Sequence, residues 1–242
     1  TGSKGDFFMK RILIVEDEEA IREFEAINLT RAGYTVVQAG SGEEALEIFE
    51  NDTEGFDIAL LDVMMPGIDG FTVCKKIREK NATMGIIMLT AKSQEMDKIS
   101  GLMIGADDYV TKPFSPSELL ARVDSLYRRV SLQIEQAKLS SDEIKLGCFA
   151  LNMRKHTLNK NGVNIEITQV EFQILEHFFN HPDTPVSRTE LLKIVWGENY
   201  YGEEKIVDVN IRRLRMKIED DPSIPKYLVT VWGMGYKWNS LG

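Results

Sequence analysis

The chain has few of the residues that stabilise disulfide-rich, metal-scaffolded or membrane-spanning proteins. Only two cysteines and three histidines occur in 242 residues. Cys74 and Cys148 lie far apart without metal-ligand spacing, so we expect two buried thiols in a reducing compartment. No apolar run approaches the roughly 18 residues that a membrane-spanning helix needs. These absences predict a soluble, cytoplasmic protein. Residues 1–8 lack a signal-peptide core and precede Met9, so we expect them to be a remnant of the expression vector.

An overall excess of basic residues is also missing, since the net charge is −9. The acidic excess falls in residues 9–130, whereas residues 143–242 contain equal numbers of acidic and basic side chains. Within that second half, residues 205–217 contain a single acid, Asp208, among the bases Lys205, Arg212, Arg213, Arg215 and Lys217. This stretch is therefore the candidate for contact with nucleic acid.

Residues 9–130 alternate short β-branched runs with amphipathic segments. This alternation predicts an α/β domain of five parallel strands, each followed by a helix. Ser41 with Glu44 and Ser115 with Glu118 match the capping-box pattern at two helix starts. We expect strands at 11–15, 35–39, 57–61, 85–89 and 108–111, and helices at 18–31, 41–50, 70–80, 93–102 and 115–129.

The remaining chain predicts a linker and a second, smaller domain. Residues 131–142 are polar and end in a Ser-Ser-Asp turn signal, so we expect a linker there. Residues 143–242 predict an α+β domain with four short strands, then helices at about 168–180, 187–196 and 205–219. A terminal hairpin is expected around Gly233-Met234-Gly235.

Polar side chains follow several of the strands expected in the first domain. Glu16 and Asp17 end the first strand, Asp62 the third, Thr90 the fourth and Lys112 the fifth. Because the carboxyl ends of parallel strands meet at one rim, we expect these groups to converge. Three carboxylates so close would repel one another unless a hard divalent cation lay among them, and this implies Mg²⁺. The alternative is an ordinary acidic helix start and an ordinary turn aspartate.

The combination predicts phosphoryl chemistry on a carboxylate. Asp62 would attack phosphorus, Lys112 and Mg²⁺ would neutralise the developing charge, and the Thr90 hydroxyl would hydrogen-bond a phosphoryl oxygen. We expect self-phosphorylation and no enzyme acting on an external substrate. The rival is a Mg²⁺-dependent phosphatase with Asp62 as nucleophile, but the chain lacks an Asp-x-Asp pair and a capping domain.

Four motifs, at residues 13–18, 61–70, 88–92 and 105–114, resemble the receiver domain of two-component response regulators over residues 10–130. The resemblance implies a flavodoxin-like (βα)5 fold with sheet order 2-1-3-4-5 and phosphoryl transfer from a sensor histidine kinase to Asp62. It also implies that the Met64 carbonyl joins the three carboxylates around Mg²⁺. Thr90 and Tyr109 would then form the switch, and the Lys112-Pro113 bond would be cis.

The basic stretch has a helical period, because Val207, Ile211, Leu214 and Ile218 recur at steps of four, three and four. We expect this stripe to be buried and the opposite face, with an exposed row of Asn210, Arg213 and Lys217, to meet DNA. The alternative is a solvated charged helix.

Motifs at residues 168–179, 191–197, 207–215 and 230–236 resemble the OmpR/PhoB winged-helix (winged helix-turn-helix) effector over residues 143–239. The resemblance implies a recognition helix at 205–219 that binds double-stranded promoter DNA. Val209, Asn210 and Arg213 would face bases, while Lys205, Arg212 and Arg215 would position the DNA backbone. Residues 197–204 would face RNA polymerase. The wing contains Gly233 and Gly235, but Trp232 stands where an arginine is common.

The family resemblance also implies a homodimer on phosphorylation, with two winged helices on direct-repeat half-sites. It would form through the fourth helix, fifth strand and fifth helix of the receiver. A second rival is a phosphorylation-independent regulator, for which Asp62→Asn would leave DNA binding unchanged. The candidate dimer residues are Lys98, Asp107, Asp108, Glu118, Arg122, Arg128 and Arg129.

Overall fold

A computed structural model describes residues 10–91, 104–136, 143–198, 200 and 202–242, with the backbone alone over 129–136. The helix expected at 93–102, including Lys98, lies outside the described residues, and so does the side chain of Arg129. Within these ranges no helix is both long enough and apolar enough to cross a membrane.

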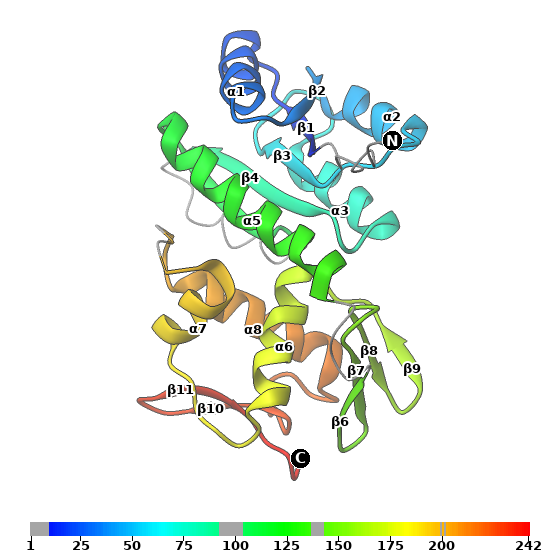
Figure 1. Cartoon of the computed structure of the whole chain (residues 1–242), viewed down its shortest axis with the longest axis vertical. Coiled ribbons are helices and arrows are strands. Elements are labelled where there is room, and N and C mark those ends of the chain that lie inside the picture. Colours follow the sequence, from blue (N-terminus) through cyan, green and yellow to red (C-terminus); the bar gives the residue numbers. More distant parts are fainter. Residues whose placement is uncertain (1–9, 92–103, 137–142, 199, 201) are drawn as a thin grey trace, which may run out of the picture.

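The first domain is the expected α/β fold (Figure 1), with a five-stranded sheet in the order β2-β1-β3-β4-β5 whose neighbours all pair in parallel. Alternate residues of β1 enter different cores, since Ile12 and Ile14 pack in one cluster and Leu13 and Val15 in another. Helices therefore cover both faces of the sheet. The elements are β1 Arg11–Val15, α1 Glu19–Arg31, β2 Thr35–Ala39, α2 Gly42–Asn51, β3 Ile58–Asp62, α3 Gly70–Lys80, β4 Gly85–Ala91, β5 Asp108–Lys112 and α5 Pro116–Gln136.

The C-terminal domain contains the expected small strands, three helices and closing hairpin. Thr168 and Glu171 form a complete capping box at the start of its first helix. Asn161 and Gly162 both have positive φ, as the turn between β8 and β9 requires. The elements are β6 Glu143–Leu146, β7 Phe149–Asn152, β8 Thr157–Lys160, β9 Val163–Ile165, α6 Gln169–Asn180, α7 Arg188–Trp196, α8 Lys205–Ile218, β10 Leu228–Val231 and β11 Gly235–Trp238.

Helix α5 is longer than the sequence indicated. It continues to Gln136, so the first part of the stretch expected as linker is helical. The residues at its end, Gln133, Glu135 and Gln136, are good helix formers, which explains why polarity alone did not end the helix.

The two domains pack against each other along the β5–α5 side of the receiver sheet. The Trp196 indole N–H donates to the Asp107 carbonyl at 3.3 Å, and the Ser125 hydroxyl donates to the Trp196 carbonyl at 2.8 Å. In Figure 1 the β10–β11 hairpin lies at the end of the molecule farthest from the receiver sheet. The end of α7 is therefore docked on the first domain, whereas the hairpin is not.

Candidate functional site

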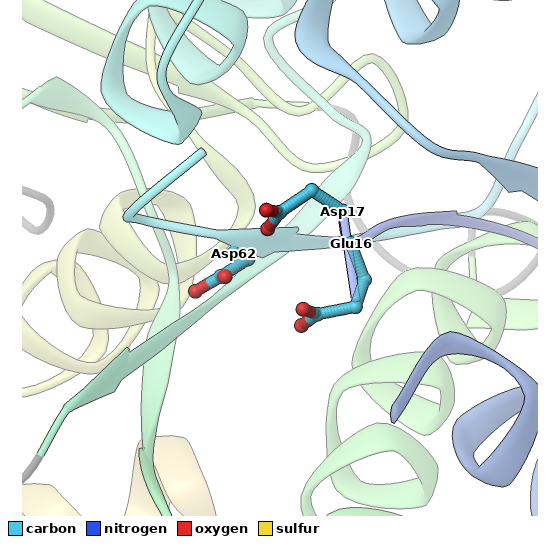
Figure 2. A group of neighbouring side chains, drawn as sticks. All are labelled: Glu16, Asp17 and Asp62. Atoms are coloured by element: carbon cyan, nitrogen blue, oxygen red, sulfur yellow. The ribbon is translucent and has the colours of Figure 1, made fainter. Parts of the chain in front are cut away.

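Three carboxylates converge at the carboxyl ends of β1 and β3. Figure 2 shows Glu16, Asp17 and Asp62 side by side, and one oxygen from each lies within 4.8 Å of the others. Glu16 and Asp62 are buried, while Asp17 is half-buried. The expected convergence is confirmed. A set of three hard oxygen donors, one of them reachable from solvent, fits Mg²⁺.

Lys112, at the end of β5, lies against this cluster. Its Nζ is 2.5 Å from Glu16 Oε2 and 3.1 Å from Asp62 Oδ2. Burial raises the pKa of Asp62 and of Glu16, although the Lys112 ammonium opposes both shifts. Burial lowers the pKa of Lys112 itself, but its contacts with Glu16 and Asp62 outweigh this and raise it. Lys112 therefore keeps its positive charge beside the carboxylate expected to attack phosphorus.

Thr90 and Met64 lie at the rim where the sequence places them. The Thr90 hydroxyl is buried and has no hydrogen-bond partner among the described residues. Such a group can donate to an incoming oxygen without first breaking another bond. The Met64 N–H lies 3.5 Å from Asp62 Oδ1, which places Met64 beside the cluster. Metal binding by the Met64 carbonyl stays a prediction.

Gly70 permits the close approach of α3 to the Asp62 strand, which sequence reasoning missed. A Cβ at Gly70 would lie 2.1 Å from the Asp62 carbonyl oxygen, so any side chain there would displace the backbone of Asp62. The signal available in the sequence was Asp69-Gly70 at a helix start, and the Asp69 side chain does cap α3 by accepting from Thr72.

Glu25 is a second residue that sequence reasoning missed. It lies on α1, is fully buried, and neither carboxyl oxygen has a hydrogen-bond partner among the described residues. Burial and the nearby negative charge of Glu16 raise the pKa of Glu25 to about 8. Its spacing of four from the buried Leu29 was the available signal, because residues four apart share a helix face.

Tyr109, the tyrosine expected to act as a switch, faces the C-terminal domain. Tyr109 is buried on β5, opposite Met88 of β4, and its phenol contacts the Glu203 backbone just before α8. Burial raises the pKa of Tyr109 to about 12. The predicted switch residue is thus in direct contact with the C-terminal domain.

Two of the three residues in the row expected to be exposed on α8 are buried, so that expectation is wrong for Asn210 and Arg213, whereas Lys217 is exposed. Asn210 is 0% and Arg213 5% exposed, and Val209 is also buried. The Arg213 guanidinium donates to the Ala106 carbonyl of the receiver at 3.1 Å. The receiver therefore covers this flank, a contact that helical periodicity cannot indicate.

A buried carboxylate also holds this flank from within the C-terminal domain. Glu171 Oε1 lies 3.0 Å from Arg213, and its Oε2 lies 2.6 Å from Lys217 Nζ, so the third member of the expected row is ion-paired too. Burial alone would raise the pKa of Glu171, but Arg213 and Lys217 hold it below its usual range.

The opposite flank of α8 is open. Lys205 and Arg212 are exposed, as their expected contacts with DNA phosphates require. Arg215 is half-buried and donates to the Leu228 carbonyl and the Thr230 hydroxyl of β10. In this structure Arg215 therefore secures the hairpin, and DNA contact by these three residues stays a prediction.

Four candidate dimer residues on the receiver form ion pairs within the chain. Asp107 pairs with Arg78 at 2.7 Å, and Asp108 pairs with Arg122 at 3.1 Å. Asp108 also accepts from the Tyr200 hydroxyl at 2.6 Å. Arg122 also pairs with Glu118 at 3.1 Å. Asp107, Asp108 and Arg122 are buried, Glu118 is half-buried and Arg128 is exposed. In this structure the C-terminal domain contacts Asp107 and Asp108 through Trp196 and Tyr200, and the dimer interface itself stays a prediction.

A parallel α/β domain with a carboxylate pocket at the ends of its strands, joined to a winged-helix domain, defines the class of DNA-binding response regulators. The sequence profile of the response regulator receiver domain matches residues 12–124, and the profile described as transcriptional regulatory protein, C terminal, matches residues 162–238. Both halves of the predicted architecture are confirmed.

Two solved structures define the family more closely. The response regulator DrrB, a Thermotoga maritima OmpR/PhoB homolog, is 34% identical, with 96% of this chain and 99% of that chain covered and a TM-score of 0.48. A mutant of the protein RitR is 25% identical, with 95% of this chain and 99% of that chain covered and a TM-score of 0.78. Because the latter score spans both domains, their arrangement is similar as well. The chain belongs to the OmpR/PhoB family of two-component response regulators.

Proposed function

We propose that this response regulator is a cytoplasmic transcription factor whose DNA binding is controlled by phosphorylation of Asp62. A sensor histidine kinase would supply the phosphoryl group. An Asp62 oxygen would bond to phosphorus while the phosphorus–nitrogen bond of the kinase phosphohistidine breaks. Support comes from Asp62 beside Lys112 and from the Thr90 hydroxyl at the same rim, which has no hydrogen-bond partner in the described part of the chain.

The residues of the pocket have distinct roles in this proposal. Glu16, Asp17 and Asp62, with the Met64 carbonyl, would hold Mg²⁺, which supplies positive charge for the transferring phosphoryl group. The Lys112 ammonium stabilises charge on the same oxygens. The Thr90 hydroxyl donates to a phosphoryl oxygen. We propose that addition and loss of this group on Asp62 is the only chemistry, and that an assay with p-nitrophenyl phosphate will show no multiple turnover.

The packed arrangement of the domains is, in this proposal, the resting state. The single observation that favours it most is the burial of Asn210 and Arg213 against the receiver, because those side chains cannot meet base edges while Arg213 is bonded to Ala106. The C-terminal domain also covers Asp108 and Arg122, which are candidates for the dimer interface. Domain packing and dimerisation therefore compete for one surface.

Phosphorylation would shift this competition. The added charge at Asp62 acts on β4 and β5 through Thr90 and Tyr109, and Tyr109 touches the C-terminal domain directly. Release of the domain would free the receiver face for a homodimer, which then holds two winged helices on direct-repeat promoter DNA. Residues 197–204 would become free to contact RNA polymerase, since Tyr200 within them is now bonded to Asp108.

Sedimentation and DNA binding of the full chain, with and without acetyl phosphate plus Mg²⁺, test this proposal. We expect a monomer to become a dimer and the DNA affinity to rise, while intact mass shows one added phosphoryl group. Asp62→Asn should abolish all three changes. A phosphorylated chain that stays monomeric at micromolar concentration, with unchanged DNA affinity, would refute the proposal.

A further inference from the structure

The loop between β1 and α1 carries two of the three pocket carboxylates and lacks a side-chain cap of its own. Glu16 and Asp17 follow β1 directly, and Glu18 is the N-cap residue of α1 without a side-chain hydrogen bond to the helix. The Glu16 N–H donates to the Ala39 carbonyl of β2 at 3.1 Å, which fixes the start of the loop. The carbonyl groups of Glu16 and Asp17 lie beyond this bond, so another group is needed to fix their orientation.

Arg22, near the start of α1, supplies that group. Its Nη1 donates to the Glu16 carbonyl at 2.7 Å and more weakly to the Asp17 carbonyl at 3.5 Å. The side chain is half-buried. A guanidinium is planar and presents its N–H groups in a rigid fork, so one side chain can fix two successive peptide groups. Here these are the peptide groups of the two acids that end β1.

The turn after β2 also packs against the guanidinium. Gly40 lies so close that a Cβ there would be 3.2 Å from Arg22 Nη1. The Gly40 N–H donates to Glu44 Oε2 of α2 at 2.7 Å, so this turn is itself fixed. Arg22 thus contacts two pieces of backbone that other hydrogen bonds already hold, which limits its movement away from the Glu16 carbonyl.

Arg22 and Lys112 act on the pocket in different ways. The acceptors of Arg22 are backbone carbonyls, whereas Lys112 contacts the carboxylates of Glu16 and Asp62 themselves. The two effects of Arg22 on a bound cation have opposite signs. Its positive charge repels Mg²⁺, while its hydrogen bonds hold the ligands in place. The direction in which metal affinity changes when Arg22 is removed therefore shows which effect dominates.

We propose that Arg22 is a positioning residue of the metal site, which holds Glu16 and Asp17 in the arrangement that binds Mg²⁺. Removing a group that orients metal ligands commonly weakens metal binding by about ten- to a hundredfold. The alternative is that Arg22 stabilises the fold alone, which would leave the metal affinity of the folded chain unchanged. This inference rests on the proposed function, in which these carboxylates hold Mg²⁺.

Binding of Mn²⁺ to the full chain tests this proposal without any phosphoryl donor. The electron paramagnetic resonance signal of the free ion measures binding, since Mn²⁺ takes the same carboxylate and carbonyl oxygens as Mg²⁺. Displacement by Mg²⁺ then gives the Mg²⁺ affinity. Arg22→Met keeps the apolar part of the side chain and removes both hydrogen bonds, so we expect about tenfold weaker binding, about 1.4 kcal/mol. Arg22→Lys retains a donor and should lose less.

Arg31→Met is the matched control, because Arg31 is exposed in the last turn of the same helix. It should bind Mn²⁺ as the wild type does, whereas Asp17→Asn should lose binding, which shows that the ion occupies this pocket. If Arg22→Met is folded by circular dichroism and binds Mn²⁺ as tightly as the wild type, or more tightly, the proposal is refuted. If Arg22→Met does not fold, Arg22→Gln replaces it, with the same expected loss.

Phosphorylation by acetyl phosphate separates positioning from a general defect. We expect the Mg²⁺ concentration at half-maximal rate to rise about tenfold in Arg22→Met, and the rate at saturating Mg²⁺ to match the wild type because every ligand is present. A lower rate at saturating Mg²⁺, with an unchanged half-saturating concentration, would overturn the proposal.

The wild type shows which of the two proposals fails. If it binds Mn²⁺ and gains one phosphoryl group in intact mass while the Arg22 variants match it, only the role of Arg22 is refuted. If the wild type binds no Mn²⁺ and gains no mass, the proposed function is contradicted as well.

Discussion

The acidic pocket of the receiver and the recognition helix α8 differ in whether their polar groups are already used. In the pocket, the Thr90 hydroxyl has no hydrogen-bond partner among the described residues, and neither has either carboxyl oxygen of Glu25, which is buried on α1. On α8, Arg213 is bonded to Glu171 and to Ala106, and Asn210 donates to the Ile206 carbonyl. The pocket therefore still has a polar group available to a ligand, whereas the receiver covers the flank of α8 that contains Asn210 and Arg213.

In the proposed function, this difference locates the control of DNA binding at the covered flank of α8. The covered flank of α8 contains the side chains expected to read bases, whereas the open flank contains Lys205 and Arg212, expected to meet phosphates. The packed arrangement thus exposes side chains expected to attract DNA nonspecifically and covers those expected to read its sequence.

The sharpest contrast on α8 is between Arg213 and its neighbour Arg212. Arg213→Ala would leave the buried Glu171 carboxylate short of one cation, so we expect a loss of about 3–5 kcal/mol in unfolding free energy. Arg212→Ala, at an exposed position, should change it by less than about 0.5 kcal/mol. Urea unfolding followed by tryptophan fluorescence reports on this domain, because all three tryptophans lie in it. Equal losses of unfolding free energy in Arg213→Ala and Arg212→Ala would contradict the difference between the covered and the exposed flank.

Glu25 allows a similar contrast in the receiver. Its folded-state pKa of about 8 exceeds the ordinary 4.5, so the folded state binds the proton more tightly. The wild type should therefore lose unfolding free energy as the pH rises from about 4.5 to about 8, with a slope of up to about 1.4 kcal/mol per pH unit.

Glu25→Leu should remove this loss and stabilise the receiver by roughly 3 kcal/mol at pH 7, measured by urea unfolding with circular dichroism at several pH values. Glu23→Leu, exposed on the same helix, is the matched control and should leave the pH dependence in place. If the unfolding free energy of the wild type does not change over this pH range, the pKa of Glu25 is not raised in the folded state.

Weakening the interface between the two domains should raise the DNA affinity of the unphosphorylated chain moderately. Tyr200→Phe removes the hydrogen bond to Asp108 and should raise the open fraction, tightening DNA binding by the unphosphorylated chain about tenfold, or about 1.4 kcal/mol. A fluorescence-anisotropy titration measures this. Tyr227→Phe is the control, since that hydroxyl contacts Cys148 within the C-terminal domain. Unchanged affinity in Tyr200→Phe would mean that this contact does not close the molecule.

The smallest expected effect belongs to the open flank. Lys205→Ala should weaken DNA binding a few-fold for all sequences alike and reduce the salt slope by about 0.9. A loss confined to one operator sequence would instead assign base readout to Lys205.

The carboxylate pocket could be predicted from the sequence because the topology of a parallel sheet determines where its residues lie. Strands that pair in parallel end at one rim, so Glu16, Asp62 and Lys112 converge without any knowledge of side-chain packing. Helix α8 was likewise predictable from the apolar stripe that ends at Ile218.

The closed flank was not predictable, since it depends on contacts between distant residues. Ala106 and Arg213 are 107 positions apart, and periodicity distinguishes buried from exposed faces within one domain only. Glu25 escaped notice for a related reason, because acidic residues on a helix are usually solvated.

Trp196 provides the most direct test of coupling between Asp62 and the domain interface, since its indole donates to the Asp107 carbonyl of the receiver. In a Trp232→Phe background the remaining tryptophans are both buried. Iodide quenching is measured before and after adding Mg²⁺ and beryllofluoride, a phosphoryl mimic, with binding of the mimic verified by calorimetry. We predict that a new quenchable component with red-shifted emission appears, and that Asp62→Asn abolishes it. If the mimic binds and Trp196 stays protected, the receiver does not control the winged helix by releasing it.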